Sequence, residues 1–159
     1  MGIKLERAML YHILYDAWDL KSWGTGPINV LQGDADSENF RNYVANHGFP
    51  YDKKLAQSFV DKISRDANIK DTFEDLCNRF HRVRKYIPDE DRDDRRKFIG
   101  LLRGILAKTC LNEMEPDIII LDEFQRFKQI LEGADETSEL AHELFNYADS
   151  KTSVRVILL

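Results

Sequence analysis

Two adjacent carboxylates, Asp122 and Glu123, follow directly after the apolar run Ile118–Leu121. An isoleucine-rich run this short predicts a strand that is buried on both faces. Because an unpaired charge is costly to bury, both acids are expected at the carboxyl end of this strand, where open α/β sheets bind their ligands. Carboxylate oxygens suit Mg²⁺, and a neighbouring carboxylate is well placed to orient a nucleophilic water. The alternative is structural: Asp122 would cap a helix that follows the strand.

The sequence Ile119-Ile120-Leu121-Asp122-Glu123-Phe124-Gln125 resembles the Walker B element, or motif II, of superfamily-two helicases and related ATP-driven translocases. In that family the aspartate holds Mg²⁺, usually through water, and the glutamate polarises the water that attacks the γ-phosphate of ATP. The resemblance therefore implies a metal-organising role for Asp122, a catalytic role for Glu123 and a coupling role for Gln125. The family usually has Ala and then Asp or His after the acid pair, so Phe124 and Gln125 depart from its pattern.

The sequence holds only one half of the nucleotide site that the resemblance implies. No Walker A motif is present, and the glycines of the breaker cluster over 22–27 lack the Gly-Lys-Ser/Thr ending. In the family, the strand after motif II ends in the Ser-Ala-Thr of motif III, whereas the matching strand here, Ser153–Leu159, closes the sequence. We therefore expect a fragment of a helicase-like, nucleic-acid-dependent ATPase. Its implied partners are a nucleic acid and the remainder of the motor domain, and alone it should bind Mg²⁺ and ATP weakly.

The elements that must position these residues form a predicted α/β fold that is predominantly α-helical. A helical module over residues 1–113 is expected to precede a β-α-β unit over residues 114–159. Strand, helix and strand in that order imply a right-handed crossover and a short parallel strand pair. Exposed edges of such a pair would permit self-association. Apolar residues at helical spacing predict helices over residues 3–20, 52–67, 70–86 and about 89–113. A cap at Ser37 and the breakers His47-Gly48 and Pro50 predict a further short helix over 37–46.

The helix expected over residues 70–86 carries a basic C-terminal end. Asp71 stands where the N-cap of this helix is expected. A separate prediction concerns Ile28–Leu31, which is expected to form a short extended piece. Attraction to the helix dipole explains basic residues at a helix C-terminus. The alternative to this structural explanation is a functional one, in which these residues contact nucleic-acid phosphates. The four basic residues concerned are Arg79, Arg82, Arg84 and Lys85.

Two other sets of residues have spacings that metal sites use. Asp34, Asp36 and Glu38 alternate as in a calcium-binding loop, but the glycine and the final glutamate of such a loop are absent. Cys77 and His81 are four residues apart on one expected helix, but no second pair with ligand spacing occurs. We therefore favour structural roles for both sets.

Composition sets the remaining bounds. The 159 residues carry a net charge of −5, which gives no overall electrostatic case for nucleic-acid binding. Two cysteines without paired spacing favour a reducing, cytoplasmic setting. No apolar run approaches the roughly 20 residues that span a bilayer, so no membrane partner is expected. The competing functional class is a helical protein-interaction module with no catalytic role, and a stand-alone metal-dependent phosphohydrolase ranks last.

Overall fold

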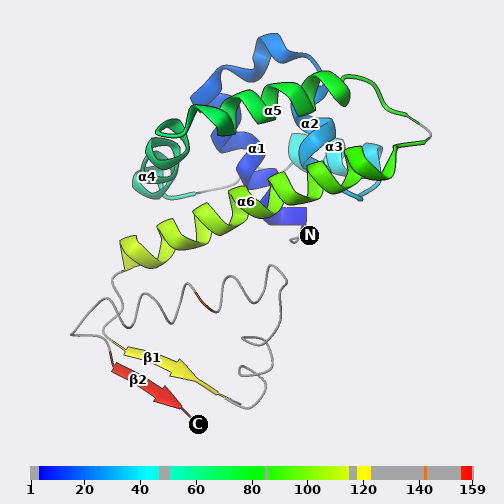
Figure 1. Ribbon diagram of the computed structural model, residues 1–159. Coiled ribbons are helices and arrows are strands. Elements are labelled where there is room, and N and C mark those ends of the chain that lie inside the picture. The colour runs from blue at the N-terminus through cyan, green and yellow to red at the C-terminus, as the bar shows by residue number, and fades with distance from the viewer. Residues whose placement is uncertain are drawn as a thin grey trace. The chain divides into compact units, whose positions relative to one another are not determined.

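The computed structural model describes residues 4–46, 51–84, 86–114, 118–122, 142 and 155–158. The chain divides into two compact units, Met1–Arg103 and Gly104–Leu159. This division falls inside the longest helix, α6 (Asp89–Met114), whereas the sequence analysis placed its boundary after residue 113. The expectation of a predominantly α-helical chain is confirmed (Figure 1). No helix within the described ranges is both long enough and apolar enough to cross a membrane.

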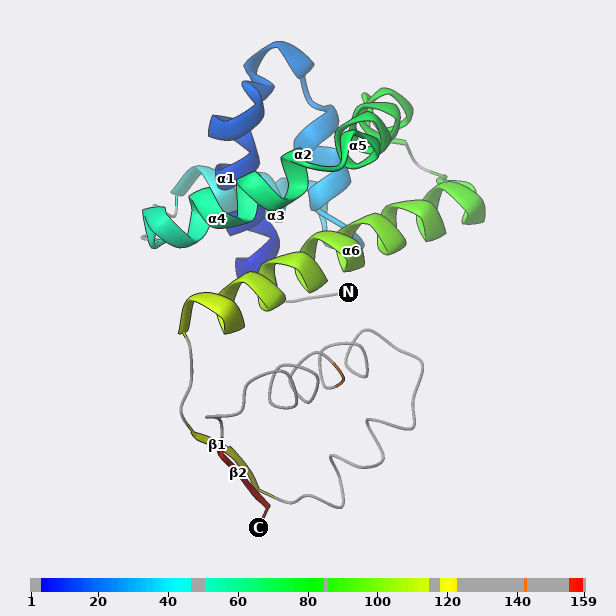
Figure 2. The same ribbon diagram turned by 60° about the vertical axis from the view of Figure 1, so that its left-hand side comes forward.

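The first unit is assembled around its N-terminal helix. In both ribbon views α2 lies beside α1, and α1 also contacts η1, α3 and α4 (Figures 1 and 2). Helix α5 packs against α2 and α4. The elements that precede α6 are α1 (Lys4–Trp18), the 3-10 helix η1 (Leu20–Trp23), α2 (Gly26–Leu31), α3 (Ser37–Asn46), α4 (Lys53–Ser64) and α5 (Ala67–Arg79).

A set of aromatic rings joins these helices at the core. The Phe73 ring of α5 lies 5.4 Å from the Phe98 ring of α6 and 5.6 Å from the Trp18 ring of α1, between centroids. Trp23 of η1 lies 5.8 Å from the same ring. Each large apolar side chain removed from water contributes about 1.5–3 kcal/mol, so this cluster is a principal source of cohesion in the unit. Fully buried side chains from other positions complete the core: Leu10, Leu14, Phe40, Phe59, Ile63, Leu76 and Leu102.

Several predicted helices are confirmed closely, and one segment was predicted wrongly. The helices expected over 37–46 and about 89–113 correspond to α3 and α6. Ile28–Leu31, expected to be extended, instead belongs to α2. A short apolar run does not distinguish strand from helix by periodicity, and Pro27 stands at the start of α2, where proline favours helix. The Arg7 Nε also donates to the Leu31 carbonyl at 3.0 Å, which satisfies a carbonyl at the C-terminus of α2.

Helix α5 begins earlier and ends earlier than predicted. Its N-cap is Asp66, whose side chain accepts from the Asn68 backbone N–H at 3.0 Å, so the expectation that Asp71 caps this helix was wrong. Its last helical residue is Arg79. The next carbonyls bond outside the helix: Phe80 accepts from the Asn29 side chain, and His81 accepts from the Thr25 hydroxyl. These contacts compete with continued helix, so Arg82 and Arg84 are not helical.

The second unit contains the last part of α6 and a pair of strands. Strand β1 (Ile118–Leu121) pairs in parallel with β2 (Arg155–Leu158), in the register Ile118 to Arg155 and Leu121 to Leu158. Of the helix expected between these strands, the structure describes His142 alone, and that residue is helical. The complete β-α-β unit therefore stays a prediction.

Candidate functional site

Asp122 is the one residue of the proposed Walker B acid pair that the structure describes. It follows directly after β1, in a turn, and its side chain is exposed. Glu123 and Gln125 lie outside the described residues, and their expected roles remain predictions. Mg²⁺ is commonly held through one or two carboxylates together with substrate phosphates and water, so a carboxylate at this position has suitable donor chemistry. Among the described residues, no group of three or more His, Cys, Asp or Glu side chains is arranged to hold a metal ion.

The strand pair that carries Asp122 has apolar residues open to solvent. Ile118 and Ile120 of β1 are 52% and 60% exposed, and Ile157 of β2 is 43% exposed. Ile119, whose side chain points to the opposite face, is buried. Parallel strands are normally covered on both faces. The isoleucines of this face are thus typical of a sheet interior but have the exposure of a surface, and the exposed Arg155, which pairs with Ile118, shares the face.

The basic residues near the end of α5 do not form one cationic surface. The Arg79 guanidinium lies 3.0 Å from both Asp75 and Asp91, and 2.9 Å from Asp94. Burial lowers the pKa of Arg79, but hydrogen bonds to Asp94 and Asp91 outweigh this effect and hold that pKa above its ordinary value. Arg79 therefore ties α5 to the first turns of α6, and its charge is already compensated.

The three other basic residues of this group differ in their surroundings. Arg84 lies 3.6 Å from the Asp91 carboxylate, which also forms an ion pair with Arg79. Arg82 is exposed and makes no ion pair with any residue that the structure describes. Lys85 lies outside the described residues. Among the described basic residues of this group, Arg82 is thus the one that has no ion-pair partner within the described part of the chain.

A charged cluster that the sequence analysis missed connects the turn after α2 with α6. The Asp34 carboxylate accepts from Arg95 at 3.0 Å and from Arg96 at 2.9 Å. Burial raises the pKa of Asp34, but hydrogen bonds and charges from Arg96 and Arg95 outweigh it and hold that pKa below its ordinary value. Arg95 is 2% exposed, and its guanidinium lies 4.9 Å from the centre of the Phe80 ring. Since 61 residues separate Asp34 from Arg95, no local spacing could have revealed the pair.

Cys77 and His81 differ in their surroundings. Cys77 is buried in α5, where burial, with a smaller effect from Glu74, raises the pKa of its thiol. A raised pKa disfavours the thiolate that binds metal. His81 lies beyond the end of α5, and its exposed ring places Nδ1 2.6 Å from the Asn78 carbonyl oxygen. The structural interpretation of both residues stays a prediction.

Family models, curated proteins and solved structures were each compared with the chain, and none of the three comparisons found a match.

Proposed function

We propose that the chain is part of a helicase-like, nucleic-acid-dependent ATPase and supplies the carboxylates that serve Mg²⁺ and the attacking water. The observation that carries the proposal is an exposed Asp122 immediately after β1, in a strand that pairs in parallel with β2. Ligands of open parallel sheets bind outside the carboxyl ends of the strands. A motif II aspartate would occupy this position.

Each residue of the motif has a distinct task in the proposed reaction. Asp122 would hold Mg²⁺ through its water shell, and Glu123 would polarise the water that attacks the γ-phosphate. Mg²⁺, when bound, would supply neutralisation of the charge that develops on the phosphate oxygens. Gln125 would couple ATP turnover to neighbouring motifs.

The exposed isoleucines support a larger sheet around this strand pair. Further strands or helices of the motor domain would cover Ile118, Ile120 and Ile157, which together resemble a sheet interior. The same missing portion would supply the backbone amides and the lysine that hold the ATP phosphates. Within this proposal, the 159 residues alone hydrolyse ATP negligibly.

The test measures Mg²⁺-dependent ATP turnover by the longer protein that the proposal requires. Glu123→Gln should lower kcat at least about a hundredfold, because general-base catalysis contributes that much or more. Asp122→Asn should raise the Mg²⁺ concentration needed for half-maximal turnover. Asp71→Asn, a substitution of an exposed acid in α5, should leave both quantities unchanged. If the isolated chain turned over ATP with Mg²⁺ and Glu123→Gln abolished that activity, the proposal of a half-site would be contradicted.

The competing candidate is a helical protein-interaction module in which Asp122 is only a helix cap. It is favoured by the first unit, which has an apolar core of its own. The reading frame around the chain discriminates between the two. Ser-Ala-Thr beyond Leu159 and Gly-Lys-Thr or Gly-Lys-Ser upstream would support the ATPase, whereas a stop codon after Leu159 would support the module.

A further inference from the structure

Helix α6 has one buried side and one side that faces solvent. Residues three and four apart lie on the same side of a helix. The buried side is formed by Arg95, Phe98, Ile99, Leu102, Leu106 and Thr109. A different side, which we call the α6 outer face, is formed by residues with exposed or partly exposed side chains: Glu90, Asp94, Lys97, Leu101, Lys108 and Asn112. The α6 outer face is therefore accessible to a second molecule.

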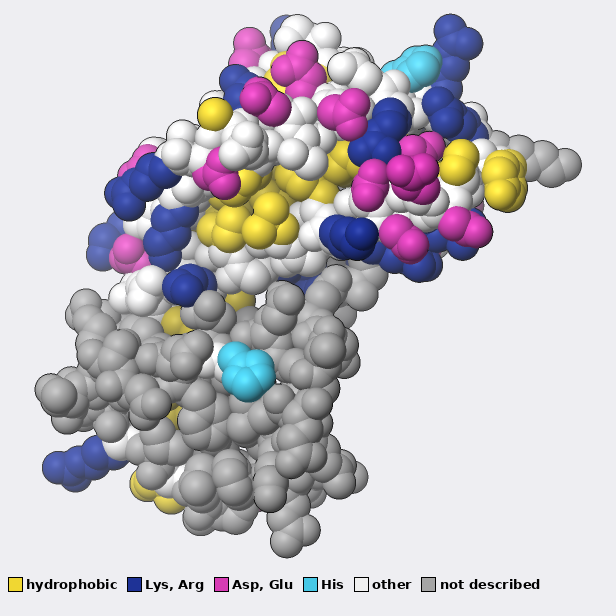
Figure 3. All heavy atoms as spheres, in the orientation of Figure 1, with side chains coloured by type: hydrophobic (Ala, Val, Ile, Leu, Met, Phe, Trp, Pro, Cys, Tyr) yellow, Lys and Arg dark blue, Asp and Glu magenta, His cyan; other side chains and the backbone are white. Residues whose placement is uncertain are grey.

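A leucine stands at the middle of the α6 outer face. Leu101 is 48% exposed, although leucine is a residue that is usually buried. Ile105, which follows one turn later, is partly buried. Figure 3 shows hydrophobic side chains at the centre of the upper part of the view, where the middle of α6 passes (Figure 1). The outer face thus has an apolar centre that a packed partner would remove from water.

Charged side chains are ordered along the same face. Glu90 and Asp94 precede Leu101, whereas Lys108 follows it. Asp94 stands seven residues before Leu101, and Lys108 stands seven residues after it. A second copy of α6, packed antiparallel with the two Leu101 side chains in contact, would therefore place Asp94 opposite Lys108 in both halves of the contact. A parallel copy would place like charges opposite each other, which is unfavourable.

Two further features suit the antiparallel arrangement. Lys97 stands four residues before Leu101 and would lie opposite Ile105 of the second copy, where its methylene chain can pack against an apolar side chain. Asp94 also lies 2.9 Å from Arg79. Because a carboxylate accepts hydrogen bonds from more than one donor, contact with Lys108 of a second copy is compatible with that ion pair.

We propose that the chain forms a twofold-symmetric homodimer through the α6 outer face, with the two α6 helices antiparallel and Leu101 at the centre. In a twofold contact the same surface is present on both copies, so a face with acids at one end and a lysine at the other complements itself. One helix pair makes a small interface, and association should therefore be weak and depend on concentration. The dimer depends on neither Asp122 nor ATP.

Sedimentation velocity of the full chain over a concentration series tests for the dimer. The wild type should shift from monomer to dimer as its concentration rises. Leu101→Asp should weaken association at least about tenfold, because each copy would lose a buried leucine from the contact. Leu5→Asp is the matched control, since Leu5 of α1 is 46% exposed, and it should change association by less than about threefold. Far-UV circular dichroism should show an unchanged helical signal for both variants.

Lys108→Glu is a second variant, which keeps the test decisive if Leu101→Asp loses helical signal. It should weaken association about threefold or more, because an acid would then lie opposite Asp94 in both halves of the contact. Lys108 is exposed, so the substitution leaves the buried side of α6 unchanged.

Disulfide cross-linking tests the orientation of the two helices. In a Cys110→Ala background, mild oxidation should link Leu101→Cys chains into dimers, because the two copies of this residue face each other. Glu90→Cys should not cross-link, because an antiparallel pair separates the two copies of residue 90 by roughly 30 Å.

The proposal is overturned if the chain remains monomeric at every concentration, which would leave the α6 outer face to a different partner. It is also overturned if Leu101→Asp weakens association no more than Leu5→Asp does. Cross-linking of Glu90→Cys that is as efficient as that of Leu101→Cys would contradict the antiparallel arrangement and indicate a parallel or nonspecific contact.

Discussion

Asn29 is 2% exposed, and its amide joins three parts of the first unit. It donates from Nδ2 to the Phe80 carbonyl at 2.7 Å, and its Oδ1 accepts from Arg41 of α3 at 2.6 Å. A buried amide with both ends satisfied stabilises one particular arrangement, because any other leaves polar groups without partners. This side chain helps to determine where α5 ends.

Asn29→Ala should lower the free energy of unfolding by about 1–3 kcal/mol, because the Phe80 carbonyl and Arg41 would lose a partner. Urea unfolding followed by circular dichroism measures the change. Asn42→Ala, at an exposed position of α3, is the control and should stay within about 0.5 kcal/mol of the wild type. Equal effects of the two substitutions would show that the buried hydrogen bonds contribute no net stability.

Gly26 is a second residue whose role depends on close packing. A Cβ at this position would lie 2.6 Å from the Cys77 carbonyl oxygen and 2.9 Å from the Cys77 Cα. These are backbone atoms of α5, which a rotamer change does not move. Glycine therefore sets how closely α2 approaches α5.

Gly26→Ala should destabilise the chain by about 1–3 kcal/mol through overpacking. Gly104→Ala provides a matched comparison, because nothing lies within 4 Å of the Cβ it would add. Since alanine is the better helix former, that variant should be about 0.5–1 kcal/mol more stable. Thermal unfolding of both variants measures the difference, and a neutral Gly26→Ala would contradict the close approach of the two helices.

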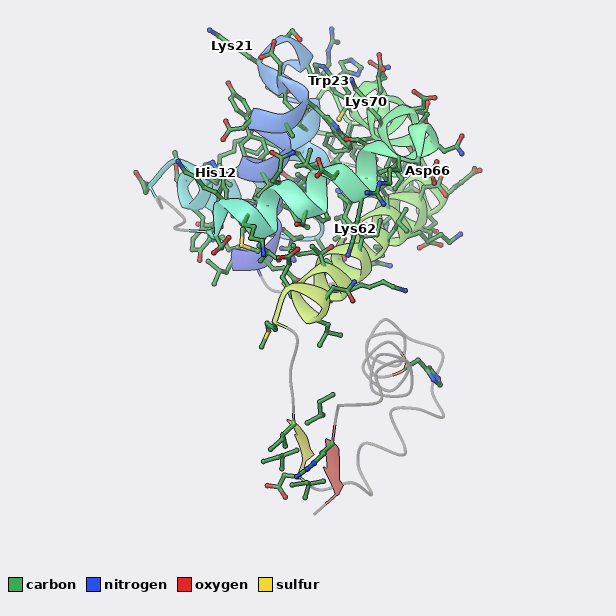
Figure 4. All side chains as sticks on the ribbon, turned by 90° about the vertical axis from the view of Figure 1, so that its left-hand side faces the viewer. His12, Lys21, Trp23, Lys62, Asp66 and Lys70 are labelled. Atoms are coloured by element: carbon green, nitrogen blue, oxygen red, sulfur yellow. The ribbon has the colours of Figure 1, made fainter. Side chains whose placement is uncertain are left out.

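At the scale of elements, the two ends of α5 are determined by different kinds of hydrogen bond, one local and one tertiary. Its beginning is local, because the Asp66 side chain accepts from a backbone N–H two residues later. Figure 4 shows Asp66 near Lys70, at this end of the helix. Its end depends on tertiary contacts, because Asn29 of α2 donates a hydrogen bond to the Phe80 carbonyl, and Thr25, the N-cap of α2, donates one to the His81 carbonyl. Arg82 and Arg84 consequently lie outside the helix and not at its terminus.

The position of the N-cap can be tested directly. Asp66→Ala should cost about 1 kcal/mol of stability, the usual effect of removing a capping side chain. Asp71→Ala, inside α5, should change stability by less than about 0.5 kcal/mol. Chemical denaturation of the two variants is the measurement. The reverse order of effects would mean that α5 starts near Asp71.

At the scale of the first unit, ion pairs between distant segments attach α6 to the other helices. Glu6 of α1 lies 2.8 Å from Arg103, and Asp34 lies within 3.0 Å of Arg95 and Arg96. The same helix also buries apolar side chains, among them Phe98 and Leu102. The attachment of α6 therefore combines burial with charge and should depend on pH.

Because the pKa of Asp34 is lowered in the folded state, its stabilising effect is fully present above the unfolded carboxyl pKa of about 4. That effect is lost as pH falls through the lower, folded pKa. Asp34→Asn should thus be less stable than the wild type at pH 7, and the difference should shrink as pH drops below about 4. Urea unfolding across acidic pH measures it. Asp71→Asn should show no such convergence, and a constant gap for Asp34→Asn at every pH would contradict the ion-pair explanation.

The sequence by itself determined the features that depend on neighbouring residues. Apolar spacing predicted α6 because a helix places residues three and four apart on one face, and a capping serine at Ser37 predicted α3. The same reasoning predicted a strand over Ile118–Leu121 with an acid at its carboxyl end. Such patterns require no knowledge of distant segments. The Walker B interpretation of Asp122 and Glu123 comes from this local pattern and remains a proposal.

Only the tertiary structure decided which charges are available and where α5 ends. Arg79 looked like Arg82 in the sequence, yet the first is bound by Asp91 and Asp94 and the second is exposed. In the sequence, Asp34 belongs to a set of acids that only partly matches a calcium-binding loop. In the structure, it pairs with Arg95, which is 61 residues away. Burial, competition for carbonyls and long-range ion pairs are properties of the packed chain. They separate residues that composition and spacing treat as equivalent.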